Sequence, residues 1–432
     1  MGCPVTVSCG SPPDGSVGTA YTHTFPTTGG PNIFFAITSG SLPPGLTLDP
    51  ATGIVSGTPT TPGIYSFTVT ITDAQILATG DDGSFSDSKI IIASDDGSTW
   101  SKVTTDITDS GYSVLWSEAA GLWINGTNFA GITDQIQTSP DGVSGNWTRR
   151  SSPADGGWVI NMISGKDKIV AIYQTGGGDA IMTSTDGITW TDRPFGTNAI
   201  GAGGGIPDIA YSPELDLYVV SEAIDVSSNP GVLTSPDGIT WTFQSAGASF
   251  VDTFTIAWGA GLFVVLGGPA GSGVHFWTSP DGINWTTRSN PAGSAANWRS
   301  LHYANGIFVA VTADSTTNPT HQAMTSPDGL TWTLRSTPAV KHWQAVTFGY
   351  GFWIAGANNS AFSQPLMTST DNGVTWSLVS ALGFNFGFVT GIAFGPVDNC
   401  NDSANCSITI TGVTQGNSWR GGMQQRIGNF FG

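Results

Sequence analysis

The feature that most constrains this chain is a short motif that returns seven times at nearly constant spacing. In one copy it reads TSPDGITW, over residues 234–241. The leading serines are 45, 45, 51, 44, 47 and 43 residues apart; they are Ser94, Ser139, Ser184, Ser235, Ser279, Ser326 and Ser369. A repeat of this length is typical of one four-stranded β-propeller blade. The wealth of Gly, Thr and Trp, beside little Leu, Glu and Lys, excludes a solenoid of helix pairs.

Each repeat also contains short apolar runs separated by turn residues. Residues 254–258 (FTIAW) precede a Gly turn, and residues 261–267 (GLFVVLG) follow it. A polar loop of variable length comes next, then a run that ends in the motif and a last run that begins at the motif Trp. Alternation at period two with Gly, Asn, Asp and Pro between the runs predicts strands and hairpins, so we expect four strands per repeat.

The motif residues themselves are expected to be structural. Asp can accept hydrogen bonds from the amides of its own turn, Gly allows a positive φ, and Trp can bury a large ring between blades. A catalytic group is needed once per site, whereas these residues occur once per repeat. The set comprises Asp96, Asp141, Asp186, Asp237, Asp281, Asp328 and Asp371, with Trp100, Trp147, Trp190, Trp241, Trp285, Trp332 and Trp376.

The repeat resembles the Asp-box of neuraminidase-type propellers, S-x-D-x-G-x-T-W, over roughly residues 74–397. STDNGVTW at 369–376 matches that pattern in full, and the other copies are one residue shorter before the Gly. The resemblance implies a propeller with BNR-type repeats. Neuraminidases also use three arginines, a Tyr and Glu pair and an Asp. Here four of the eight arginines recur three residues after a motif Trp and so belong to the repeat; they are Arg150, Arg193, Arg288 and Arg335.

No catalytic pair of carboxylates stands out in this sequence. The glutamates are Glu118, Glu214 and Glu222, and glycoside hydrolysis needs two suitably placed carboxyl groups. We therefore expect no enzymatic activity, with a divergent glycan hydrolase as an alternative.

The two ends of the repeat region complete each other. Residues 388–395 (FVTGIAFG) look like the first strand of a blade, while residues 74–103 hold a second, third and fourth strand. The sequence thus predicts an all-β chain with a seven-bladed propeller over residues 74–398, closed by pairing N- and C-terminal strands in one blade, which leaves no exposed sheet edge.

Strand connections predict where a ligand would bind. The motif turns and both ends of the propeller fall on one face, which we call the motif face. The opposite face, the free face, carries the variable loops, including residues 149–158, 288–298 and 335–343. Side chains at the ends of these loops are our candidate ligand-binding residues: Trp158, Trp298, Arg299, Lys341, His342 and Trp343. Alternatively, each Trp plugs the central channel or packs on the adjacent blade.

Metal and cofactor binding have little support in the sequence. His275, His302 and His321 are scattered, and the repeats contain no Cys. We expect no cofactor and no metal site.

The first 73 residues predict a separate small β-sandwich. Alternation with Pro and Gly turns continues through LPPGLTLDPATGIVSGTPTTPGIYSFTVTITDA, which ends at Ala74. This stretch resembles an Ig-like domain family found in bacterial surface proteins and phage virion proteins. The resemblance implies a spacer or attachment module. Asp49 and Asp73 fit either calcium binding, as in cadherin-like relatives, or turn capping.

The ends of the chain carry all four cysteines, with the same spacing: Cys3 and Cys9, and Cys400 and Cys406. Four cysteines allow three pairings, and disulfides or, more weakly, a metal site are open. Residues 399–432 are too short for a domain, and we expect them to pack on the Ig-like module or on a partner subunit. The start fits a myristoylation pattern formally but no signal peptide, and no run reaches membrane-spanning length.

Composition narrows the function further. The net charge of −18 argues against nucleic acid and anionic membranes as partners. Together these features predict a non-enzymatic binding protein, a receptor-binding or adhesion component of a phage tail or virion that recognises a host glycan or protein. The alternatives are a purely structural virion or cell-surface protein and an extracellular location.

Overall fold

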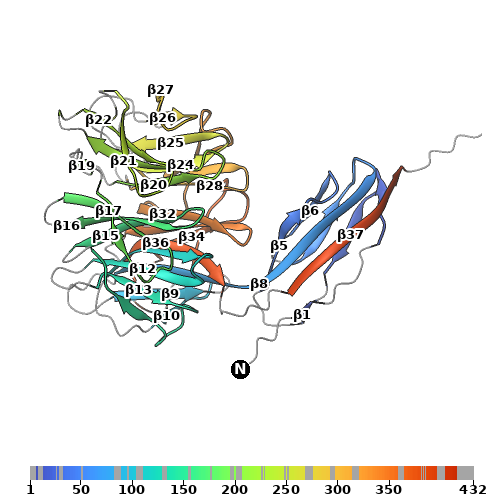
Figure 1. Cartoon of the computed structure of the whole chain (residues 1–432). Coiled ribbons are helices and arrows are strands. Elements are labelled where there is room, and N and C mark those ends of the chain that lie inside the picture. Colours follow the sequence, from blue (N-terminus) through green and yellow to red (C-terminus); the bar gives the residue numbers. More distant parts are fainter. Residues whose placement is uncertain are drawn as a thin grey trace, which may run out of the picture. The chain divides into compact units, whose positions relative to one another are not determined.

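The computed structural model is all-β and divides into two compact units, residues 1–72 with 400–432, and residues 73–399 (Figure 1). It describes residues 6–7, 13–25, 27–28, 33–49, 52–81, 89–94, 97–103, 110–128, 134–153, 157–175, 178–194, 199–200, 207–224, 227, 229–247, 250, 253–267, 276–291, 297–313, 321–358, 364–380, 382, 384, 386–396 and 404–415. Every element within these residues is a strand.

The first unit is a small β-sandwich. One sheet joins β2 (Ser16–Val17), β37 (Ala404–Gln415), β8 (Gly63–Asp81) and β5 (Ile33–Gly40); a second joins β3 (Tyr21–Thr24), β7 (Ile54–Gly57) and β6 (Leu46–Leu48), and β1 (Thr6–Val7) pairs with β4 (Thr27–Thr28). Phe25, Phe35, Val55 and Phe67 are buried in its core. The C-terminal segment contributes β37, whose Ile408 pairs with Phe67 of β8.

The second unit consists of four-stranded antiparallel sheets, seven of them within the described residues. In order from inner to outer strand they are β36 (Phe388–Pro396), β8, β9 (Lys89–Ser94) and β10 (Ser101–Val103); β11 (Ser110–Ser117), β12 (Leu122–Asn128), β13 (Ile136–Ser139) and β14 (Thr148–Arg150); β15 (Trp158–Ser164), β16 (Ile169–Thr175), β17 (Gly178–Ser184) and β18 (Thr191–Asp192); β20 (Ile209–Ser212), β21 (Leu217–Ile224), β22 (Pro230–Ser235) and β23 (Thr242–Ser245); β24 (Thr253–Gly259), β25 (Leu262–Gly267), β26 (Phe276–Ser279) and β27 (Thr286–Arg288); β28 (Trp298–Ala304), β29 (Ile307–Thr312), β30 (Ala323–Ser326) and β31 (Thr333–Arg335); and β32 (His342–Gly349), β33 (Phe352–Asn358), β34 (Leu366–Ser369) and β35 (Ser377–Leu378).

This arrangement is the predicted β-propeller fold, closed by its ends. β36, from the C-terminal end, pairs antiparallel with β8, from the N-terminal end, so that Ile392 lies opposite Ala78. The short strand β19 (Ala199–Ile200) adds to β21.

A one-residue bulge recurs in the inner strands and aligns the blades. The strand register shifts at one extra residue in β11, β15, β24, β28, β32 and β36; we call these the bulge positions, and they are Tyr112, Ile160, Phe254, Arg299, Gln344 and Thr390. β20 begins after this point. Its Ile209 is equivalent to Ile256 of β24, so Pro207, two residues before Ile209, is equivalent to the bulge position Phe254.

In β24 and β28, the hydroxyl group of the residue after the bulge position accepts a hydrogen bond from the next blade. The backbone N–H of Leu301 donates to Thr255 Oγ1 at 3.0 Å, and that of Val346 donates to Ser300 Oγ at 3.0 Å. Because the same bond joins β28 to β24 and β32 to β28, it fixes the heights of these three inner strands relative to one another.

Glycines near the ends of the inner strands make room for aromatic rings of the following blade. A Cβ on Gly259 would lie 2.0 Å from Cγ of Tyr303, and one on Gly349 would lie 2.2 Å from Cγ of Phe394. Real Cβ atoms do not approach other carbons so closely, so these positions require glycine.

The motif builds the turn between the third and fourth strands as expected from its residues. In one copy, Asp237 Oδ1 accepts the N–H groups of Ile239 at 2.8 Å and Thr240 at 2.7 Å, and Gly238 has φ of +66°. These amide donors hold the pKa of Asp237 down to about 2. Trp241 is buried behind the turn. Asp96 of the first copy lies outside the described residues.

Candidate functional site

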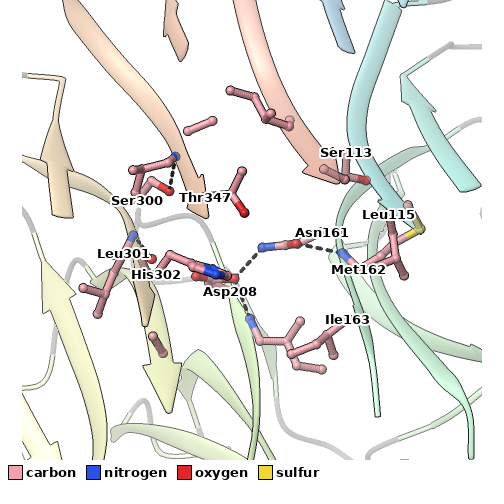
Figure 2. A pocket seen from close by; sticks show the side chains of 18 of the residues that line it. Ser113, Leu115, Asn161, Met162, Ile163, Asp208, Ser300, Leu301, His302 and Thr347 are labelled. Atoms are coloured by element: carbon pink, nitrogen blue, oxygen red, sulfur yellow. Dashed lines mark hydrogen bonds between the residues drawn. The ribbon is translucent and has the colours of Figure 1, made fainter. Parts of the chain in front are cut away.

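The inner strands surround a central cavity of about 520 Å³ (Figure 2). All seven inner strands, β11, β15, β20, β24, β28, β32 and β36, contribute lining residues. A volume of this size is typical of small-molecule sites in proteins. Because all seven inner strands line it, the cavity is the channel of the propeller. Its free-face opening lies at the level of the bulge positions.

Asp208 is the one carboxylate that lines the described part of the channel. Its Oδ1 accepts hydrogen bonds from Asn161 Nδ2 and from the N–H of Ile209 at 2.7 Å, and its Oδ2 accepts the N–H of Ile256 at 2.9 Å. Burial raises the pKa of Asp208 to about 6, against the opposing effect of these amides. The carboxylate thus connects three blades, as the dashed lines in Figure 2 show in part.

His302 is the imidazole of the channel. Its ring meets Trp353 edge to face, with the ring centroids 5.9 Å apart. Burial lowers the pKa of His302 to about 4, so the ring is neutral at pH 7.

An aromatic pair and a cation lie at the free-face end of the channel. Trp158 is 40% exposed, and its ring lies against Tyr112 with the centroids 6.1 Å apart. Tyr112 and Arg299 both line the channel at bulge positions. Burial lowers the pKa of Arg299, and its electrostatic interaction with Tyr112 acts in the opposite direction.

The structure separates the three Trp residues that the sequence suggested as ligand contacts. Trp298 and Trp343 are fully buried, at 0% exposure, which corrects the expectation that their rings face a ligand. Both directly precede a bulge position, whereas Val159 holds that place in β15 and Trp158 comes one residue earlier. Successive residues of a strand point to opposite sides, so only Trp158 turns outward.

The three polar residues that the sequence suggested as ligand contacts, Arg299, Lys341 and His342, lie in different surroundings. Arg299 lines the channel, and His342 is exposed at the start of β32. Lys341 is half-buried, with its backbone N–H donating to Gln322 Oε1 at 2.9 Å. The six residues therefore do not form one surface, although Trp158 and Arg299 lie at the same end of the channel.

Sequence reasoning missed several channel residues: Tyr112, Asn161, Asp208, His302, Gln344 and Thr347. Aligning the inner strands of the repeats would have singled out His302 and Thr347, because the other copies carry Ala, Ile or Leu at that level. An alignment that matches Trp158 to Trp298 is wrong by one residue, because the bulge lies two residues after Trp158 and one residue after Trp298.

Other predicted sites fall partly outside the described residues. Cys3, Cys9 and Cys400 lie outside them, and Cys406 pairs through its backbone with Val69. Among the residues that the structure describes, no group of three or more His, Cys, Asp or Glu side chains could hold a metal ion. The same residues contain no helix that could span a membrane.

Comparisons with known proteins agree with the fold. Residues 4–88 match the family described as Putative Ig domain. No curated protein matches the chain in sequence. A putative 6-phosphogluconolactonase from Bacteroides uniformis is similar in structure, with a TM-score of 0.53, 10% identity and coverage of 74% of this chain and 99% of that one. Virginiamycin B lyase from Staphylococcus aureus has a TM-score of 0.51 and 12% identity over 71% of this chain and 97% of that one. At such identities the likeness concerns the fold alone, a β-propeller, while the Ig-like domain rests on the family match.

Proposed function

We propose that this chain is a non-enzymatic binding protein whose propeller recognises a glycan at the free-face opening of its channel. The observation that carries the proposal is Trp158, which is 40% exposed beside Tyr112. Sugar rings present apolar C–H faces edged by hydroxyl groups, so they pack on exposed aromatic rings while nearby polar groups bind their oxygens.

The fold does not explain the exposure of Trp158. Trp298 is the first residue of β28 and Trp343 the second of β32, and both are buried, so they contribute to packing. Trp158 leaves that packing position to Val159, which is fully buried. Trp is enriched among the residues that contribute most to binding, so an exposed Trp at the opening of a channel is a candidate ligand contact.

The described channel also supports binding rather than glycan cleavage. Hydrolysis of a glycosidic bond uses two carboxyl groups about 5–9 Å apart. Asp208 is the one carboxylate among the described lining residues, and its oxygens already accept hydrogen bonds from three blades.

We further propose that the protein is a component of a phage tail or virion, in which the Ig-like unit attaches to the particle and the propeller meets the host surface. The match of residues 4–88 to an Ig-like family supports an attachment module. A purely structural role for the propeller is the alternative, and an exposed Trp158 beside half-buried Tyr112 on the free face favours binding over it.

A glycan array tests the proposal. Wild type, Trp158→Ala and the control Ile188→Ala are compared; Ile188 is likewise 40% exposed but lies in a motif turn. We expect wild type and Ile188→Ala to bind the same glycans and Trp158→Ala to lose them. Absence of binding by folded wild type would move the assignment to a structural role.

A further inference from the structure

Four polar side chains of the channel lie on two neighbouring strands, β28 and β32. Arg299 and Gln344 occupy the bulge positions of these strands, and His302 and Thr347 follow three residues later. We call these four residues the polar wall. β28 and β32 lie side by side, since Val346 of β32 donates to Ser300 of β28 at 3.0 Å.

The other inner strands carry apolar residues at the level of His302 and Thr347. They are Leu115, Ile163, Ala210, Ala257 and Ala393. Since five blades pack with Ala, Ile or Leu at this level, the propeller fold does not require an imidazole or a hydroxyl group there.

Three side chains of the polar wall, those of Gln344, His302 and Thr347, are not used by the protein's own hydrogen bonding among the described residues. Partly buried polar groups without partners cost free energy, so fold stability alone does not favour them. Figure 2 shows His302 and Thr347 among the side chains around the cavity.

The chemistry of the wall defines what it can bind. Arg299 has only donors, while Gln344, Thr347 and neutral His302 each offer a donor and an acceptor. The wall therefore matches a ligand edge rich in oxygen atoms. Ala210, Ala257 and Ile163 on the other side of the channel match an apolar face.

We propose that the channel is a subsite for the terminal sugar residue of the glycan, with the oxygen-bearing edge of that residue on the polar wall. This inference rests on the proposed function and adds to it the depth and orientation of binding: the chain of the glycan lies across Trp158 and its end enters the channel.

Saturation-transfer NMR with free monosaccharides tests the channel subsite separately from the proposed contact with Trp158. The probes are glucose, galactose and glucuronate, with acetate as an anion that lacks a sugar ring. The test variant is His302→Ala, Thr347→Ala, which introduces the alanine that other blades carry at this level. Thr333→Ala is the matched control, because Thr333 is exposed on the outer strand β31.

We expect at least one monosaccharide to receive saturation from wild type and from Thr333→Ala, and its affinity for the double variant to fall at least tenfold. Thermal unfolding of the double variant should stay within about 2 °C of wild type, which separates loss of contact from loss of fold. Equal binding by the double variant would overturn the inference, as would complete displacement of the sugar by equimolar acetate.

The glycan array separates the two proposals. Loss of array binding in Trp158→Ala, with full binding by the double variant, contradicts the channel subsite and leaves the proposed function standing. Array binding that survives in Trp158→Ala contradicts the proposed contact with Trp158. This holds for any result of the monosaccharide experiment.

Discussion

The ring of Trp158 lies against that of Tyr112, 6.1 Å between centroids and with the planes inclined by 31°, although the two residues come from neighbouring blades. β12 and β15 also pair where Asn128 lies opposite Trp158, which fixes the start of β15. The backbone of the two blades thus holds the aromatic pair in place at the channel opening.

Removing the exposed indole should weaken glycan binding without harming the fold. Trp158→Ala is expected to lower affinity about 30-fold, because losing an aromatic ring on which a ligand packs costs on the order of 2 kcal/mol. Titration calorimetry with a glycan selected on the array measures this. Ile188→Ala should bind like wild type. Equal affinities for Trp158→Ala and wild type would refute the proposed contact between the glycan and Trp158.

Asp208→Asn should destabilise the propeller. An amide offers one oxygen, so its NH₂ group would take the place of either Oδ1, which accepts the N–H of Ile209, or Oδ2, which accepts the N–H of Ile256, and leave that donor unsatisfied. We expect a loss of about 2 kcal/mol in the free energy of unfolding, measured with denaturant. Asp167→Asn is the control, since the Asp167 side chain is 68% exposed. Equal stability of both variants would show that Asp208 does not connect the blades.

The pH dependence of stability should also report Asp208. Its pKa in the folded protein, about 6, lies above the ordinary value of 3.8, so the folded state holds this proton longer than the unfolded state. The associated stabilisation is complete below pH 3.8 and is lost as pH rises through 6. The advantage of wild type over Asp208→Asn should therefore be smaller at pH 7 than at pH 4.5, by on the order of 1–2 kcal/mol.

His302 also makes the free energy of unfolding depend on pH in this range, but its contribution to stability is lost as pH falls, whereas that of Asp208 is lost as pH rises. The pKa of His302 in the folded protein, about 4, lies below 6.5, so its contribution is lost as pH falls from 6.5 towards 4. Because His302 is present in both proteins, subtracting the two stability curves cancels its effect. A constant difference between wild type and Asp208→Asn across this range would contradict the shift assigned to Asp208.

Gly259→Ala should test the packing between blades. The new methyl group would lie 2.0 Å from Cγ of Tyr303, so ring or backbone must move, at a cost of about 2–3 kcal/mol in unfolding free energy. In a Tyr303→Ala background the same substitution should cost under about 0.5 kcal/mol. A similar cost in both backgrounds would mean that the clash with Tyr303 is not its cause.

Much of the fold could be predicted because each repeat carries its own turn chemistry. Asp237 and Gly238 specify a turn by local hydrogen bonds and backbone conformation, and the unmatched strands at the two ends of the repeat region indicate closure. These features act over a few residues or through simple strand counting, so sequence reasoning reaches them.

The site was harder to predict because it depends on register and on contacts between blades. Trp158 and Trp298 look alike in sequence, yet a shift of one residue relative to the bulge exposes one ring and buries the other. Asp208 resembles many turn aspartates until the backbone of Ile256, 48 residues away, is brought next to it. Such relationships exist only between blades.

Hydrogen–deuterium exchange of the full chain, with and without an array-selected glycan, tests the central claim most directly. Binding at the free-face end of the channel predicts slower amide exchange in residues 110–116, 158–164 and 299–303, with unchanged exchange in the motif turns at 186–190 and 237–241. Protection confined to the motif turns, or to the Ig-like unit, would contradict it.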